Sequence, residues 1–167
     1  MKLKKMLKSR PDLKVIGITG SYGKTSVKYY LQTLLQSKYS VLITPGNFNT
    51  PLGVTRTVRE HLKPTHEIFL CEMGARRVGE IKEVCDIAHP DYGIITSVGP
   101  QHLETFFSIE NIQKTKFELA DALPKNSMLF RFGQSVALNL ILCFSSCAFT
   151  PFPSLLFTSS TDSTSVF

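Results

Sequence analysis

Short apolar runs alternate along the chain with amphipathic stretches, and turn residues separate them. Strands are predicted at 15–19, 41–44, 68–73 and 92–98, where β-branched and other apolar residues dominate. Helices are predicted at 25–37, 51–62, 78–87 and 109–122. Strands that alternate with helices predict an α/β fold with a mostly parallel sheet and helices on both faces.

A glycine-rich segment with the pattern G-x-x-G-K-T-S follows the first predicted strand. Between a strand and a helix, such a loop surrounds phosphate oxygens with backbone N–H groups, its lysine meets the outer phosphates, and its threonine ligates Mg²⁺. The strict Walker pattern needs a glycine where this chain has Ile18, and a glycine turn capped by serine and threonine is the alternative. The candidate nucleotide-binding residues here are Gly20, Ser21, Tyr22, Gly23, Lys24, Thr25 and Ser26.

Polar residues also follow the other predicted strands, and in parallel sheets ligands bind beyond the carboxyl ends of strands. Glu72 closes an apolar strand, which makes it a candidate metal ligand, with a capping or surface acid as the alternative. Asn47, Asn49 and Thr50 either contact the nucleotide or substrate or build an Asx turn. His102 follows the fourth strand and is a candidate site residue or a loop histidine bonded to a carbonyl.

Five segments, taken in order, resemble motifs of the Mur ligases. They are GITGSYGKTS (phosphate loop), GNFNTPLG at 46–53 (asparagine-rich loop), CEMGARRVGEI at 71–81 (acidic strand end), ITSVGPQHLETF at 95–106 (histidine loop) and KTKFELADALP at 114–124 (lysine helix). The EMGA-x-x-x-GEI form of the strand end favours the branch of the family that adds D-alanyl-D-alanine. The resemblance spans residues 14–130.

The resemblance implies an ATP-dependent ligase of peptidoglycan precursor synthesis, which joins D-Ala-D-Ala to UDP-MurNAc-tripeptide through an acyl phosphate. It also implies two Mg²⁺ ions, the first held by Thr25 and Glu72 and the second by His102 and a carbamylated Lys116. Lys24, His102 and Lys116 are then the catalytic residues. An unperturbed lysine has a pKa near 10.4, so under about one in a thousand is neutral at pH 7, and carbamylation needs a site that favours the neutral amine. The alternative for Lys116 is a surface lysine.

Charge is unevenly distributed along the 167 residues, which carry a formal net charge of +6. Five of the basic residues lie in the first ten positions, so the excess is local and does not indicate nucleic acid. A solvated N-terminus is favoured over membrane contact through residues 1–10. The four cysteines lack a C-x-x-C or zinc spacing and no secretory signal precedes them, which predicts a reduced, cytoplasmic setting.

Three segments are predicted: a basic segment at 1–13, a partial ATP-binding domain at 14–130, and an atypical tail at 131–167. The tail has no charged residue from Phe132 to Thr161. A membrane span around 136–149 is shorter than the roughly 20 apolar residues needed, so a frame-shifted or disordered tail is favoured.

The length has no room for a three-domain ligase, so weak or absent ligase activity is expected of this chain by itself. The alternatives are a non-catalytic ATP-binding fragment, a membrane-associated interaction protein, or another Mur superfamily ligase such as folylpolyglutamate synthase.

Overall fold

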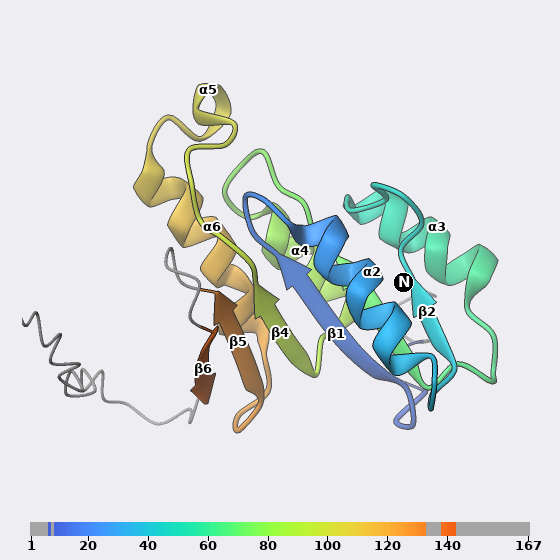
Figure 1. The fold of residues 1–167 in the computed structure, drawn as a ribbon. Coiled ribbons are helices and arrows are strands. Elements are labelled where there is room, and N and C mark those ends of the chain that lie inside the picture. Colours follow the sequence, from blue (N-terminus) through green and yellow to red (C-terminus); the bar gives the residue numbers. More distant parts are fainter. Residues whose placement is uncertain (1–6, 8, 133–137, 143–167) are drawn as a thin grey trace, which may run out of the picture.

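A single six-stranded sheet organises the protein, seen here in a computed structural model that describes residues 7, 9–132 and 138–142 (Figure 1). The strand order is β2-β3-β1-β4-β5-β6. Neighbouring strands from β2 to β5 run parallel, and β6 runs antiparallel to β5. The strands are β1 (Lys14–Thr19), β2 (Val41–Ile43), β3 (Ile68–Glu72), β4 (Tyr92–Ile95), β5 (Met128–Phe132) and β6 (Leu138–Leu142).

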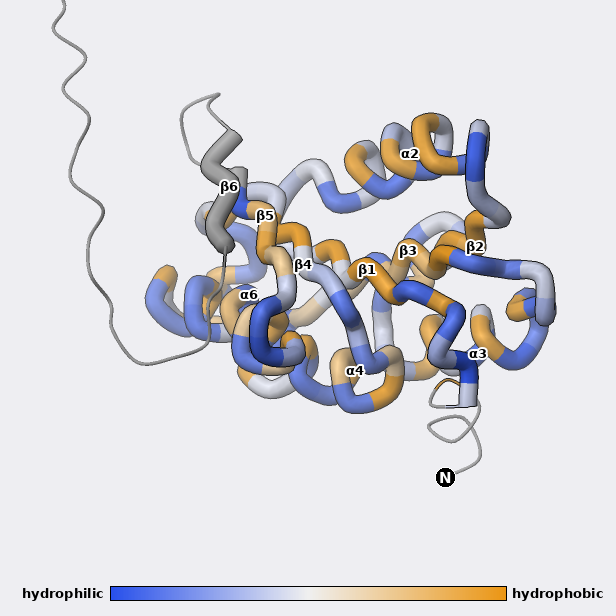
Figure 2. Tube along the Cα trace, turned by 90° about the horizontal axis from the view of Figure 1, so that it is seen from below, coloured by the Kyte–Doolittle hydropathy of each residue, from blue (hydrophilic) through white to orange (hydrophobic). Residues whose placement is uncertain are grey.

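Helices cover both faces of this sheet. In Figure 2, α2 lies on one face, and α3, α4 and α6 lie on the other. The helices are α2 (Lys24–Leu35), α3 (Pro51–His61), α4 (Glu80–Ala88), α5 (Leu103–Phe106) and α6 (Ile109–Ala122). The predicted α/β fold is therefore confirmed, while the short helix α5 and the strands β5 and β6 were not predicted.

The side chains of the strands divide into two apolar layers. Phe69 and Cys71 point into the layer under α3, α4 and α6. Leu70, between them in sequence, points into the layer under α2, where Ile18 and Leu31 join it. Alternate residues of a strand face opposite sides of a sheet, and a parallel sheet is buried on both sides, which explains why these strands are continuously apolar.

The sheet continues past residue 130, where the sequence analysis placed the end of the domain. Arg131 lies in β5 opposite Asn139 of β6, so part of the predicted tail pairs with the sheet. The segment 143–167 lies outside the described residues, as do residues 133–137 and most of the basic N-terminal segment. Within the ranges that the structure describes, no helix is both long and apolar enough to cross a membrane.

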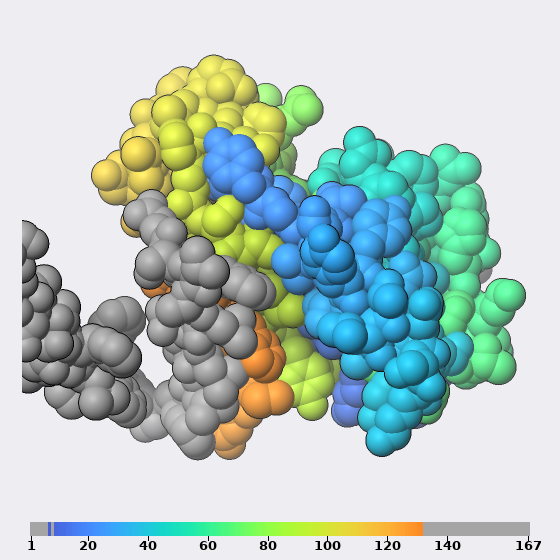
Figure 3. Space-filling model, viewed as in Figure 1, coloured from blue at the N-terminus to red at the C-terminus, as the bar shows by residue number. Residues whose placement is uncertain are grey.

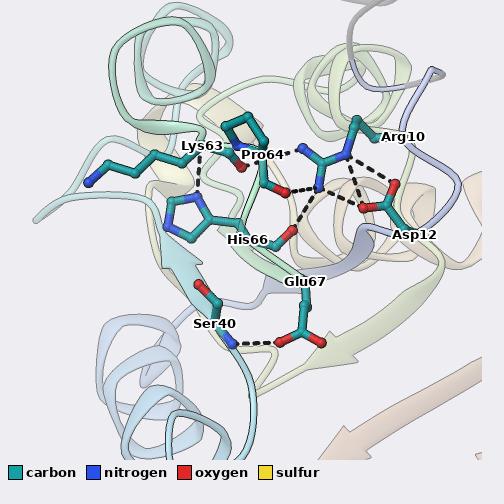
Figure 4. A network of polar contacts seen from close by, with 7 residues as sticks. All are labelled: Arg10, Asp12, Ser40, Lys63, Pro64, His66 and Glu67. Carbon is teal, nitrogen blue, oxygen red and sulfur yellow. Dashed lines mark hydrogen bonds and ion pairs between the residues drawn. The ribbon is translucent and has the colours of Figure 1, made fainter.

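The segment that precedes β1 is fastened to the turn between α3 and β3 (Figure 4). The Arg10 guanidinium donates to both carboxylate oxygens of Asp12, and its Nη2 also donates to the carbonyl oxygens of Pro64 and His66, each at 2.9 Å. This contact lies at the amino ends of β1 and β3. The opposite edge of the sheet, where the strands have their carboxyl ends, carries the polar loops predicted to bind a ligand.

Candidate functional site

The loop of residues 20–23 joins the end of β1 to the start of α2. Gly23 is the N-cap of α2, no side chain caps the helix, and its first turn contains no acidic residue. Backbone N–H groups and the positive end of the helix dipole are therefore left for an anion. The local structure matches that of the phosphate loop predicted from the sequence.

The segment after β4 braces this loop. The Ser21 N–H donates to the Ser97 carbonyl at 2.6 Å, and the Ser21 hydroxyl donates to the Gly99 carbonyl at 2.9 Å. The two segments lie against each other on the surface (Figure 3). A β-carbon on Gly20 would overlap the Thr96 hydroxyl, so the close approach requires glycine. These contacts tie the phosphate loop to the segment after β4.

Lys24 folds back onto the loop that precedes it. Its Nζ donates to the carbonyl oxygens of Gly20 at 2.8 Å and Ser21 at 3.1 Å. Burial lowers the pKa of Lys24, and the nearby charge of Glu72 opposes that effect. Tyr22 is 53% exposed. The loop therefore offers a bound ligand both the Lys24 ammonium and the Tyr22 ring.

Glu72 lies at the centre of the site, at the carboxyl end of β3, and is 1% exposed. The Thr25 hydroxyl lies 3.1 Å from both of its carboxylate oxygens, and the Asn49 amide donates to Oε1 at 3.1 Å. Lys28 Nζ forms an ion pair with Oε2 at 2.9 Å. The structure thus brings together Thr25, Asn49 and Glu72, which lie far apart in the sequence and were each predicted as site residues.

Lys28 is part of this cluster but was not predicted. It is fully buried, and its Nζ also donates to the carbonyl oxygens of Thr44 and Gly46 at 2.8 and 2.6 Å. The signal available in the sequence is its spacing, because residues four apart lie on the same face of a helix and Lys28 follows Lys24 by four. A second lysine on the phosphate-loop face of α2 could have been flagged on that ground.

The other residues of the asparagine-rich loop have structural contacts. The Thr50 hydroxyl accepts a hydrogen bond from the Gly53 N–H at 3.3 Å as the N-cap of α3. The Asn47 carbonyl accepts a hydrogen bond from the Asn49 N–H at 2.7 Å. Asn47 is exposed, as is Ser26 after the phosphate loop. Of the three candidates in this loop, Asn49 alone contacts Glu72 through its side chain in the described structure.

His102 and Lys116 do not join this cluster. His102 is the N-cap residue of α5, and its Nδ1 lies 3.6 Å from Glu104 Oε1. In the part of the chain that the structure describes, no hydrogen bond or ion pair links either residue to the other or to Glu72. Lys116 is 2% exposed, so the interpretation of it as a surface lysine is wrong, and its Nζ lies 5.7 Å from the centre of the Phe106 ring.

The surroundings of Lys116 disfavour its charge. Burial and the nearby positive charge of Lys24 lower its pKa to about 8, while Glu118 and Glu80 act in the opposite direction. A pocket of about 490 Å³ lies beside the Phe106 ring that covers this lysine. Its lining residues are Arg77, Val78, Glu104, Thr105, Phe106, Phe107 and Asn111.

Two of the candidate residues are placed to hold one magnesium ion. The Thr25 hydroxyl and the Glu72 carboxylate converge as oxygen donors, the ligands that Mg²⁺ prefers. Lys116 as an ammonium group has no lone pair to offer, and the described residues contain no group of three or more His, Cys, Asp and Glu placed to hold a metal. A second Mg²⁺ ion held by His102 and a carbamylated Lys116 stays a prediction.

Comparison with known proteins gives consistent results. A family model described as the Mur ligase middle domain matches residues 18–140. The chain is 37% identical over 126 residues to UDP-N-acetylmuramoyl-tripeptide--D-alanyl-D-alanine ligase of Bacillus subtilis, which covers 75% of this chain and 27% of that protein. The ligase of the same name from Mycobacterium bovis is 43% identical over 112 residues, 67% of this chain and 22% of that protein. The chain thus spans about a quarter of the length of these curated relatives.

Solved structures show the same fold. MurF from Thermotoga maritima in complex with ADP has a TM-score of 0.73 and 36% identity, covering 80% of this chain and 32% of that one. MurF from Acinetobacter baumannii has a TM-score of 0.73 and 32% identity, covering 77% and 28%.

Proposed function

The chain belongs to the Mur ligase family, and we propose that it is the ATP-binding, carboxylate-activating part of a ligase that adds D-alanyl-D-alanine to UDP-MurNAc-tripeptide in peptidoglycan synthesis. The observation that carries the proposal is the convergence of Thr25, Asn49 and Glu72 beside an uncapped helix start that bears Lys24. The names of the relatives support the substrates. Because the reaction consumes ATP, we place it in the cytoplasm.

Each residue of the cluster has a part in binding the nucleotide. The N–H groups at the start of α2 receive phosphate oxygens, and the Lys24 ammonium exchanges its bonds to the loop carbonyls for bonds to the outer phosphates. Thr25 and Glu72 would hold a Mg²⁺ ion, and its positive charge would offset the repulsion between anionic oxygens when a carboxylate meets the γ-phosphate. Asn49 keeps the Glu72 carboxylate oriented.

Lys116 is proposed as the site of carbamylation, which its environment favours. With a pKa of about 8, about one lysine in ten is neutral at pH 7, far more than for an ordinary lysine. The neutral amine would add to CO₂ with loss of one proton, and the carbamate would replace a buried cation by oxygen ligands. Mass spectrometry on the native chain, with and without bicarbonate, tests this: a gain of one CO₂ that disappears in Lys116→Met supports it, and no gain contradicts it.

Calorimetric titration with ATP and Mg²⁺ tests the nucleotide site directly. We expect Lys24→Ala to weaken binding at least about tenfold, because hydrogen bonds to charged groups contribute about 1.5–3 kcal/mol each. Lys38→Ala, which removes an exposed lysine after α2, is the matched control and should bind like the unaltered chain. Equal affinity in the Lys24→Ala and Lys38→Ala variants would contradict the assignment of the loop.

Ligation by the chain alone is expected to be slow. Holding reactants in register can supply on the order of 7–11 kcal/mol of a reaction barrier, and the chain spans about a quarter of its relatives. An assay that follows amide formation between UDP-MurNAc-tripeptide and D-Ala-D-Ala measures this. Amide formation as fast as that of a full-length relative would show that the matched region positions the substrates unaided. ATP binding with no amide formed would favour a nucleotide-binding fragment.

A further inference from the structure

We propose that Lys28 is a positioning residue that holds Glu72 and the loop after β2 in the arrangement needed to receive the nucleotide's metal ion. The inference rests on the proposed nucleotide site and adds to it a residue that no phosphate-loop motif includes. It follows from the burial, the hydrogen bonds and the charges around Lys28 and Glu72.

The pair is enclosed by protein. The side chains of Lys28 and Glu72 are 0% and 1% exposed, and their charged atoms lie 2.9 Å apart. A buried charge is costly unless it is paired and hydrogen-bonded, so each of these groups depends on the other. The carboxylate proposed as a metal ligand is therefore held by a partner on α2, one turn beyond the phosphate loop.

The hydrogen-bonding capacity of Lys28 is already fully used. An ammonium group has three donors, and three oxygens surround this one: Glu72 Oε2 at 2.9 Å, the Thr44 carbonyl at 2.8 Å and the Gly46 carbonyl at 2.6 Å. Lys24, by contrast, is partly exposed, and among the described residues its Nζ donates only to carbonyls of its own loop. Lys28 thus lacks a free donor for phosphate, which distinguishes positioning from direct nucleotide binding.

The contacts of Lys28 also align the neighbouring groups. The Thr44 hydroxyl accepts a hydrogen bond from the Glu72 N–H at 3.1 Å, while the Thr44 carbonyl accepts from Lys28. Lys28 therefore ties the end of β2 to the end of β3. With Oε2 of Glu72 occupied by Lys28, Asn49 contacts Oε1 and Thr25 approaches both oxygens. This division leaves the face of the carboxylate next to Thr25 for a cation.

Two opposing effects follow from removing Lys28. Loss of its positive charge favours a cation at Glu72, whereas loss of its three bonds releases the carboxylate and the Gly46 carbonyl. Partners that orient a metal ligand typically change metal affinity by about 10–100-fold when they are lost. Because Lys28 holds the ligand and the loop together, we expect the loss of orientation to be the larger effect.

The experiment compares Lys28→Met, Glu72→Gln and the double variant with a matched surface control, Lys38→Met. The first measurement is the side-chain amide resonance of Asn49 by ¹⁵N NMR without nucleotide. The second is ATP affinity by calorimetry with and without Mg²⁺. We expect Lys28→Met to shift the Asn49 resonance as Glu72→Gln does. We also expect it to lower the gain in affinity that Mg²⁺ provides by about 10–100-fold, and the double variant to lose no more than Glu72→Gln alone.

An unchanged Asn49 resonance, or an equal loss of affinity with and without Mg²⁺, would overturn the inference, since the second result marks a purely structural role. Lys28→Arg keeps the charge but not the fit to three oxygens, and it serves if Lys28→Met does not fold. It should reproduce the Asn49 shift, and behaviour like the unaltered chain would refute the inference. If the unaltered chain binds no ATP, the proposed function fails, and the NMR measurement still decides whether Lys28 positions Glu72.

Discussion

Two lysines are buried in this protein in opposite chemical settings. Lys28 on α2 has three oxygens within 2.9 Å of its Nζ, one of them a carboxylate oxygen. Lys116 on α6 is 2% exposed and faces the ring of Phe106, and its Nζ donates no hydrogen bond to any described residue. Burial by itself therefore does not decide what a lysine does. All three N–H donors of Lys28 are bonded to oxygens, which stabilises its charged form. Burial of Lys116 instead favours its neutral form.

The largest effect is expected from breaking the coordinated pair. Lys28→Met should lower the free energy of unfolding by about 3–5 kcal/mol, because it leaves the Glu72 carboxylate buried without its cation. The double variant Lys28→Met, Glu72→Gln should recover part of that loss, since both charges are then gone. Urea unfolding at pH 7 measures both. A loss under about 1 kcal/mol in the single variant would show that the pair does not stabilise the fold.

Replacing Lys116 is expected to stabilise the fold, whereas replacing Lys28 destabilises it. The pKa of Lys116 is about 8 in the folded chain, below its ordinary 10.5, so the unfolded chain binds more protons between these values. Stability should therefore rise with pH from about 8 to about 10.5. Lys116→Met, which keeps the packing on Phe106, should remove this rise and stabilise the chain at pH 7 by up to about 3 kcal/mol.

Unfolding curves at several pH values, in buffers free of bicarbonate, measure this effect. Lys114→Met, on the exposed side of α6, is the control and should keep the rise with pH. If Lys116→Met loses stability at pH 7, the contrast between the two lysines does not hold.

Displacing the Asn49 side chain should disturb the cluster around Lys28 and Glu72 and leave the surroundings of Lys116 unchanged. A β-carbon on Gly74 would lie 2.7 Å from Asn49 Cγ and Oδ1, so Gly74→Ala pushes this side chain away from Glu72. Overpacking of this kind typically costs about 1–3 kcal/mol. We expect weaker Mg²⁺-dependent ATP binding, and an unchanged rise of stability with pH because Lys116 is not contacted. Calorimetry and pH-dependent unfolding check the two parts separately.

The smallest effects are expected at the helix caps of the two regions. Ser108 caps α6, which carries Lys116, by accepting from the Asn111 N–H at 3.1 Å, and Thr50 caps α3 in the loop that contains Asn49. Replacing either residue by alanine should cost about 1 kcal/mol in thermal unfolding. Equal losses of stability in the two variants would show that the helix caps contribute equally in both regions. The regions would then differ in the environments of their lysines and not in the stability of their helix ends.

Much of the fold could be predicted from alternation alone. The predicted helix at 109–122 matches α6 residue for residue, because Pro124 and an amphipathic pattern mark its limits. β5 and β6 were missed because the segment after 122 shows no period that favours a strand over a turn. β5 pairs with β4 and β6 pairs with β5, and these sheet edges exist only once the preceding strands have come together.

The candidate site was predicted in part for a related reason. Thr25, Asn49 and Glu72 follow the ends of parallel strands, which share one edge of a sheet, so their meeting could be inferred. Lys28 could not be found in this way, since a lysine on a helix is usually exposed and its burial depends on the ends of β2 and β3. His102 illustrates the converse, because a motif position does not show which neighbour the side chain contacts.

The bracing of the phosphate loop has a consequence for the chain during its synthesis. β1 comes early in the sequence but lies in the middle of the sheet, where Lys14 pairs with Ile68 and Ile16 with Tyr92. A chain that is still emerging from the ribosome therefore holds an apolar strand without partners until β3 has been translated, and contacts so distant in sequence form slowly. The hydrogen bonds that Ser21 donates can form only later, after residues 97–99 have been translated. The phosphate loop is therefore translated before the other parts of the proposed nucleotide site, but it reaches its final conformation only after the segment that follows β4 has been made.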